Sequence, residues 1–312
     1  MRVVTIMLGT IALTGGAGLS TWGRGAPMPL PRGEVAAAFA GGRIYVVGGF
    51  TADGQNSPRV DAYSPARDSW RSVPDLPVAV DHAMAAGYRG KLYAVGGYGP
   101  GRSPLATLFA YSGGSWTRLA PMPEQRAAGG AAVVNGKLYV VGGVTSSTTD
   151  GSSQTSRLAT SALVYDIARN RWSTRRGPTP REHLGVTALG GRIYALGGRT
   201  AGFDTNLARA EVYNPQTGKW RRLPRLPGRR GGTGAAGLGR WVISVGGEAP
   251  PGTIRTVYGF DVRRGHWSKL PNLPTPRHGL GVVAVGHRAY VIGGGTAPGL
   301  SVSSANEFLT IR

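Results

Sequence analysis

Residues 129–143 read GGAAVVNGKLYVVGG, and this stretch decides the fold. Two short apolar runs flank Asn135-Gly136, a pair that suits the two-residue type I′ turn of a β-hairpin. The second run carries Tyr139 and ends at the diglycine Gly142-Gly143, where missing side chains let two backbones approach closely. The stretch therefore predicts two antiparallel strands whose end packs against another part of the chain.

The same pattern recurs six times along the 312 residues. Diglycines after apolar runs stand at Gly48-Gly49, Gly96-Gly97, Gly142-Gly143, Gly197-Gly198, Gly246-Gly247 and Gly293-Gly294. Five of them are followed by an aromatic residue and then a tryptophan, as Tyr63/Trp70, Tyr111/Trp116, Tyr165/Trp172, Tyr213/Trp220 and Phe260/Trp267. A period of about 50 residues marks a repeat architecture in which each unit buries its faces against its neighbours.

This signature resembles the kelch repeat, and the resemblance extends from about Trp22 to the C-terminus. It implies an all-β fold: a six-bladed kelch-type β-propeller with four antiparallel strands, a to d, in each blade. Strand a is the innermost of the four. The Tyr and Trp side chains are expected to fill the wedges between blades.

The spacing of the tryptophans predicts how the ring closes. Each of the five tryptophans above precedes the next diglycine by 25 or 26 residues, and Trp22 precedes Gly48 by the same 26. The sixth repeat has a strand c near Ala305–Ile311 but no strand d. An N-terminal strand around Ser20–Arg24 should therefore complete the last blade and leave no open sheet edge. Residues 20–312 are expected to form one domain.

The first residues have the character of an export signal. Arg2 is followed by the largely apolar run Val3–Leu13 and by small residues from Thr14 to Ser20. Residues 1–19 are therefore predicted to be a secretory signal peptide, with a buried β-strand as the alternative. This places the protein outside the cell or in the cell envelope or periplasm. No run is long enough for a membrane span, which needs about 20 apolar residues.

Charge and cysteine content limit the classes of function. The formal net charge is +21, and of the 36 basic residues only four are lysine. Such a charge favours anionic partners, although arginine-rich usage scattered over the surface explains it as well. There are no cysteines, which excludes disulfides and thiolate catalysis. Galactose oxidase is another kelch propeller, but its copper site needs a Tyr–Cys link, so copper radical oxidase activity is rejected.

The connections from strand d to the next strand a carry a recurring basic residue after a Pro-rich turn. The expected ligand-binding face consists of Arg32, His82, Arg126, Arg181, His183, Arg229, Arg230, Arg277 and His278. Kelch domains that capture acidic peptides use arginines at the matching place, so the resemblance implies a face that accepts anions. The alternative is that these arginines brace neighbouring blades by binding loop carbonyls. The three histidines come from different blades with no local ligand spacing, so neither a metal nor another cofactor is expected.

These observations favour a non-catalytic binding module for an acidic ligand: a glycan, a cell-wall polymer or a protein. No local catalytic motif is present. The alternative is a sugar-modifying enzyme resembling sialic acid epimerases/mutarotases, with Arg181, Glu182 and His183 as the acid–base candidates. Electrostatic nucleic-acid binding is less favoured, because it fits poorly with a signal peptide. The Ser/Thr-rich stretch 144–160 is expected to be a flexible loop rather than a substrate lid.

Overall fold

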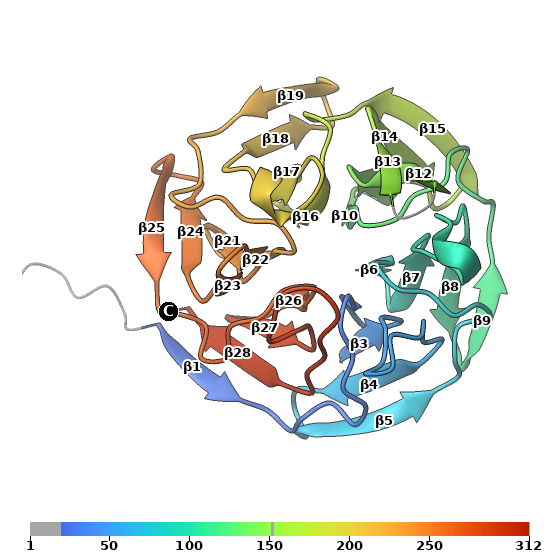
Figure 1. Cartoon of the computed structure of the whole chain (residues 1–312), viewed down its shortest axis with the longest axis horizontal. Helices are drawn as coiled ribbons and strands as arrows, with labels where there is room; N and C mark the ends of the chain where they lie inside the picture. Colours follow the sequence, from blue (N-terminus) through green and yellow to red (C-terminus); the bar gives the residue numbers. More distant parts are fainter. Residues whose placement is uncertain (1–19, 151–152, 312) are drawn as a thin grey trace, which may run out of the picture.

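The computed structural model describes residues 20–150 and 153–311, which form a closed ring of six four-stranded antiparallel blades (Figure 1). The described residues contain two short 3-10 helices, η1 (Pro100–Arg102) and η2 (Phe203–Thr205). The expected six-bladed all-β propeller is therefore confirmed. The predicted signal peptide, residues 1–19, lies outside the described residues. Within the described part, no helix is long and apolar enough to cross a membrane.

The first three blades follow one another along the chain. Blade 1 consists of β2 (Ala36–Ala40), β3 (Arg43–Val47), β4 (Val60–Ser64) and β5 (Ser69–Val73). Blade 2 consists of β6 (Met84–Tyr88), β7 (Lys91–Val95), β8 (Leu108–Ser112) and β9 (Ser115–Arg118). Blade 3 consists of β10 (Gly130–Val134), β11 (Lys137–Val141), β14 (Ser161–Asp166) and β15 (Arg171–Arg176).

The last three blades complete the ring. Blade 4 consists of β16 (Glu182–Leu189), β17 (Arg192–Arg199), β18 (Ala210–Asn214) and β19 (Lys219–Arg222). Blade 5 consists of β20 (Gly234–Leu238), β21 (Trp241–Val245), β24 (Val257–Asp261) and β25 (His266–Leu270), with the small β22 (Glu248–Ala249) and β23 (Gly252–Thr253) in its b–c loop. Blade 6 consists of β26 (Gly281–Val285), β27 (Arg288–Ile292), β28 (Asn306–Thr310) and β1 (Thr21–Arg24).

Blade 6 contains the seam of the ring. Its outer strand β1 comes from the N-terminal end and pairs antiparallel with β28, with Trp22 opposite Leu309. The closure expected from the position of Trp22 is therefore confirmed. Because β1 covers the edge of β28, the sheet of the last blade does not stop one strand short.

The Asn135-Gly136 turn and the Gly142-Gly143 pair adopt the left-handed backbone conformations and the close backbone packing that their residues favour. Asn135 (φ 49°) and Gly136 (φ 72°) both adopt left-handed backbone conformations between β10 and β11, as a type I′ turn requires. Gly143 (φ 90°) lies so close to the d–a loop that a Cβ atom there would stand 2.4 Å from the Ala127 carbonyl oxygen. Its N–H donates to the Arg181 carbonyl of blade 4 at 2.9 Å. All six blades repeat this bond between the second glycine and the following blade.

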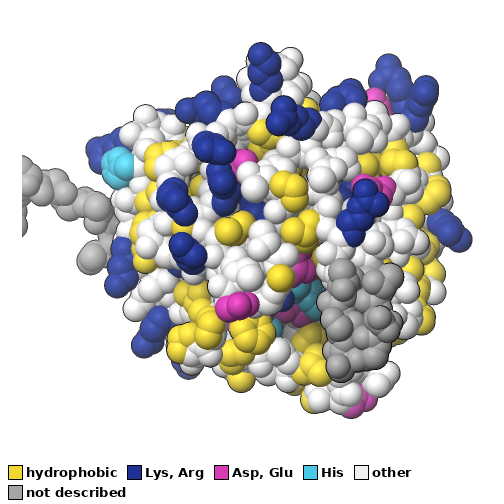
Figure 2. Space-filling model, turned by 45° about the horizontal axis from the view of Figure 1, so that its top comes forward, with side chains coloured by type: hydrophobic (Ala, Val, Ile, Leu, Met, Phe, Trp, Pro, Cys, Tyr) yellow, Lys and Arg dark blue, Asp and Glu magenta, His cyan; other side chains and the backbone are white. Residues whose placement is uncertain are grey.

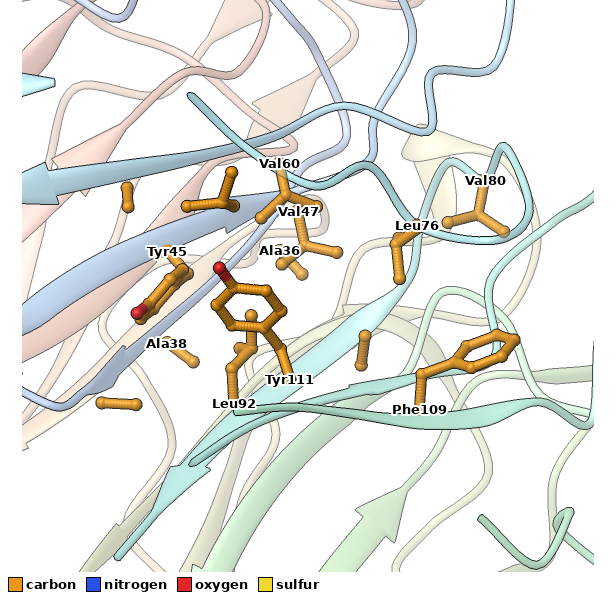
Figure 3. Close-up of a cluster of buried hydrophobic side chains, with 14 residues drawn as sticks. Ala36, Ala38, Tyr45, Val47, Val60, Leu76, Val80, Leu92, Phe109 and Tyr111 are labelled. Carbon is orange, nitrogen blue, oxygen red and sulfur yellow. The ribbon is translucent and has the colours of Figure 1, made fainter. Parts of the chain in front are cut away.

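Aromatic residues fill the wedges between blades, as expected. Between blades 1 and 2, Tyr45 and Tyr111 meet edge to face with ring centroids 5.7 Å apart, beside Leu92 (Figure 3). Phe109 of the same cluster lies toward Leu76 and Val80. The outer tryptophans also fasten the blades to one another, since each indole Nε1 donates to a carbonyl of the preceding blade. The pairs are Trp22–Pro271, Trp70–Ala26, Trp116–Pro74, Trp172–Ala120, Trp220–Arg176 and Trp267–Pro224.

The Ser/Thr-rich b–c connection of blade 3 differs from its expectation. Instead of an irregular loop, the chain forms the hairpin strands β12 (Val144–Asp150) and β13 (Ser153–Leu158). Threonine is β-branched and favours extended backbone, so a Thr-rich stretch pairs with itself once its ends are held together by β11 and β14.

Candidate functional site at the channel mouth

The arginines that follow the Pro-rich turns point into the blades. Arg32, Arg126, Arg181, Arg230 and Arg277 are at most 1% exposed. Arg277 shows the arrangement: Nε donates to the Gly293 carbonyl at 2.9 Å and Nη2 to the Val291 carbonyl at 2.7 Å. Its Nη1 donates to the Thr275 carbonyl at 2.7 Å and pairs with the buried carboxylate of Glu307.

This burial corrects the expectation of an arginine-lined mouth. A guanidinium that already binds carbonyls and a carboxylate inside its blade is not available to a ligand in the channel. For Arg32, Arg181, Arg230 and Arg277 the structure shows the bracing alternative, with the difference that the carbonyls belong mainly to the arginine's own blade. Arg126 is buried too, but it binds Glu124 and the Ser161 hydroxyl instead of carbonyls. Arg229 is the exception, because it is exposed on its d–a loop. Blade 2 has no such arginine, and the buried Val80 takes its place.

The residues that face the mouth stand two positions after each buried arginine, or after Val80 in blade 2. They are Glu34, His82, Ala128, His183, Gly232 and Gly279, which we call the mouth ring. All six have left-handed backbone with φ between 49° and 64°. Their backbones form a continuous chain of hydrogen bonds around the channel, in which His82 N–H donates to the Glu34 carbonyl at 3.0 Å and Val35 N–H donates to the Gly279 carbonyl at 3.1 Å.

Three side chains of the mouth ring converge. His82 Nε2 lies 2.9 Å from His183 Nε2 and 3.3 Å from a carboxylate oxygen of Glu34. The three side chains are only 7–10% exposed. His278 stands one position before the ring, with Nδ1 3.1 Å from the other oxygen of Glu34. The structure thus brings together the three histidines that the sequence singled out, and Glu34, a carboxylate that the sequence also places on this face, lies between them.

Acidic residues surround this cluster and are paired in turn. Asp81 contacts Nδ1 of His82. Glu182 Oε2 lies 3.1 Å from Nδ1 of His183, in ion-pair range but not aligned as a hydrogen bond. The guanidinium of Arg199 forms ion pairs with both Glu182 and Glu248: its Nε lies 2.9 Å from Glu182 Oε1 and its Nη1 lies 2.6 Å from Glu248 Oε1. Sequence reasoning missed Arg199, which sits two residues after the first glycine of the Gly197-Gly198 pair.

The pairing lowers the pKa values of two of these carboxyl groups, Glu34 and Glu182. Burial alone would raise the pKa of Glu34, but the nearby His82 and His278 hold it well below its usual value. Burial likewise opposes ionisation of Glu182, yet His183 and Arg199 lower its pKa to about 2. A carboxyl group with so low a pKa is a poor general acid. Because Arg181 is also turned into the blade, the three acid–base candidates of the sugar-enzyme alternative do not converge.

The cluster opens into the central channel, a cavity of about 390 Å³. The six innermost strands line it with small side chains, mainly Ala, Gly and Val. Acidic and histidine side chains gather in a hollow of the face shown in Figure 2, with hydrophobic side chains at its rim. The polar chemistry of the channel is therefore concentrated at the mouth.

Known proteins share this repeat pattern. The family model described as the KLHDC2/KLHL20/DRC7 Kelch-repeats domain matches residues 121–294, and the Kelch motif matches residues 31–77 and 84–123. The Kelch-like protein terF of Aspergillus terreus is 29% identical over 244 residues, covering 73% of this chain and 52% of that protein. Beta-scruin of Limulus polyphemus is 27% identical over 70% of this chain and 24% of its own length. Mouse Kelch-like protein 40 is 33% identical over 57% of this chain and 28% of its own length. The chain thus spans about half or less of the length of these relatives.

Proposed function

This chain belongs to the kelch-repeat family, and from that premise we propose that it is a non-catalytic binding module for an acidic polypeptide segment. The observation that carries the proposal is the placement of exposed apolar side chains. Among the described residues, the large exposed hydrophobics are Phe39, Phe203 and Leu300. Phe203 and Leu300 stand on b–c loops, which share the face of the channel mouth. An exposed apolar group beside a polar hollow is typical of an interaction site.

Phe203 and the loop that carries Leu300 both contact charged residues of the mouth. The guanidinium of Arg199 lies 5.8 Å from the centroid of the Phe203 ring. Gly299, next to Leu300, donates its N–H to Glu248 at 3.2 Å. A ligand that covers Phe203 and Leu300 would therefore lie across the mouth.

The charge of the face supports an acidic partner. Arg102 and Arg157 are exposed on the b–c connections of blades 2 and 3, and Arg229 is exposed on a d–a loop of the same face. The whole chain carries +21. Exposed basic charge on these loops speeds the approach of an acidic segment. Export of the protein is part of the proposal, and N-terminal sequencing of the native protein would test it.

Selection from a phage library of random peptides tests the function. We expect enriched peptides to combine acidic residues with a large apolar side chain. Replacing Phe203 or Leu300 with Ala should weaken their binding about tenfold or more, because interface energy is concentrated in such side chains. Phe39→Ala, at the opposite end of the channel, is the matched control and should leave affinity unchanged.

Two outcomes would contradict the proposal. Peptides that bind the Phe203→Ala and Leu300→Ala variants as tightly as the unchanged protein would place the interface elsewhere. Retention of acidic polysaccharides in place of peptides, with the same dependence on these two side chains, would make the ligand a glycan. Binding to either ligand should weaken as salt rises, since exposed charges are screened.

A further inference from the structure

Three side chains of the mouth ring have the chemistry and the spacing of metal ligands. Glu34, His82 and His183 each offer a ligand atom, and these atoms all lie within 4.8 Å of one another. They come from blades 1, 2 and 4, so only the closed ring assembles them. We infer that they bind one divalent transition-metal ion at the channel mouth, a site that the chain's local sequence spacing gave no reason to expect.

Two of the three distances between the ligand atoms fit one metal ion directly. Two ligands bonded at about 2.1 Å lie about 3.0 Å apart at neighbouring octahedral corners and about 3.4 Å apart in a tetrahedron. His82 Nε2 lies 2.9 Å from His183 Nε2 and 3.3 Å from Glu34 Oε2. A movement of these side chains that brings His183 Nε2 closer to the Glu34 carboxylate would therefore place all three ligand atoms on one ion.

The second nitrogen of each imidazole faces a carboxylate. Asp81 contacts Nδ1 of His82, and Glu182 Oε2 lies 3.1 Å from Nδ1 of His183. A carboxylate at Nδ1 favours the proton on that nitrogen and leaves the lone pair on Nε2. The two Nε2 atoms then present their lone pairs 2.9 Å from each other at the channel mouth. Two acceptors at 2.9 Å repel each other unless a cation lies between them.

The remaining coordination positions are open to the channel. Ala128, Gly232 and Gly279 complete the mouth ring and bring no polar side chain to the site. Gly279 also makes room for the carboxylate, since a Cβ atom there would stand 2.4 Å from Glu34 Cδ. Three protein ligands with open positions are typical of a metal that also binds water or a ligand.

The ligand set defines the class of metal. Two imidazole nitrogens and one carboxylate oxygen suit Zn²⁺ and Fe²⁺, whereas Ca²⁺ and Mg²⁺ prefer all-oxygen sites. The competing explanation is a single proton shared by the two imidazoles. It accounts for the short nitrogen–nitrogen distance, and Glu34 would then balance the charge of the protonated pair. Metal titration distinguishes the two explanations.

Titration of the tag-free, chelator-stripped protein with Co²⁺, followed by its visible absorption, tests the site. We expect one ion per chain. His82→Ala or His183→Ala should weaken binding by at least about 100-fold, the upper range for loss of a supporting residue. Ala128 already occupies the same left-handed position in blade 3, so these changes suit the backbone. His287→Ala, at an exposed a–b turn, is the matched control and should bind like the unchanged protein.

The proposal fails if the unchanged protein binds no stoichiometric ion, which would favour the shared proton. It also fails if His287→Ala loses as much affinity as His82→Ala, because binding would then be to surface histidines. Should a mouth-ring variant unfold, the electron paramagnetic resonance spectrum of bound Cu²⁺ in the unchanged protein decides. Hyperfine coupling to two nitrogens supports the site, and coupling to none or one overturns it.

Discussion

At the scale of single residues, the buried arginines supply hydrogen-bond donors to backbone carbonyls at the end of the second strand of a blade. The carbonyls of Gly293 and Val291 lie where strand β27 ends, and Arg277 supplies donors for both. Because Arg277 and Glu307 are buried together, each neutralises a charge that burial would otherwise make costly. The arginine is thus a structural part of blade 6.

Replacing Arg277 tests this role. Arg277→Met should lower the free energy of unfolding by about 3–5 kcal/mol, since Glu307 would remain buried without its partner. Urea denaturation measures the change. Arg229→Met is the matched control, and as an exposed residue it should change stability by less than about 0.5 kcal/mol. Equal stability of the two variants would contradict the bracing role.

The residue scale is also where sequence reasoning went wrong. The d–a position of Arg181 could be read from the repeats, but the direction of its side chain depends on carbonyls that only the folded blade presents. Aligning the repeats on these arginines does place Glu34, His82 and His183 at one common position. Only the structure shows that blades 1, 2 and 4 bring the three within contact.

At the scale of elements, the strand β1 completes the sheet of blade 6 and also bonds this blade to blade 5. It pairs with β28 along four residues and donates the Trp22 indole N–H to the Pro271 carbonyl at 2.9 Å. The next blade is fastened in turn, because Trp70 donates to the Ala26 carbonyl just after β1. Loss of β1 therefore removes bonds to blades 5 and 6 and leaves the Ala26 segment, which Trp70 of blade 1 binds, without its strand.

A chain that begins at Gly25 should lose on the order of 5 kcal/mol of stability, from several hydrogen bonds and one half-buried tryptophan. Its melting temperature should fall by roughly 10 °C or more. Calorimetry measures the difference, and a chain that begins at Ser20 is the control. A Gly25 chain that melts with the Ser20 chain would show that blade 6 does not need its outer strand.

The elements were largely predictable, because the glycines and tryptophans mark the strand ends in every repeat. Trp22 alone sufficed to place β1 in blade 6. The hairpin β12–β13 was not foreseen, since its Ser/Thr composition suits both a loop and an extended pair. The paired strands β11 and β14 hold the two ends of this segment together, which favours the extended pair over an irregular loop. Amino-acid composition carries no information about how the ends are held.

At the scale of the whole molecule, the fold and the site were predictable to different degrees. The repeat period determined six blades because each blade needs neighbours to bury its faces. The net charge of +21 did not locate the site, since the channel mouth gathers histidines, carboxylates and Arg199, whereas the arginines expected there are buried in the blades. A site formed by several blades depends on which residues the closed ring brings face to face.

The ring of interblade bonds has a consequence for how the protein opens. Every blade donates a glycine N–H to the next blade and a tryptophan N–H to the preceding one, so no blade is an end repeat that can fray. Opening any blade breaks two interfaces at once. Amide hydrogen exchange should therefore reveal one cooperative unit, with inner-strand amides in all six blades equally protected. Faster exchange confined to β26 and β27 would show instead that the seam opens first.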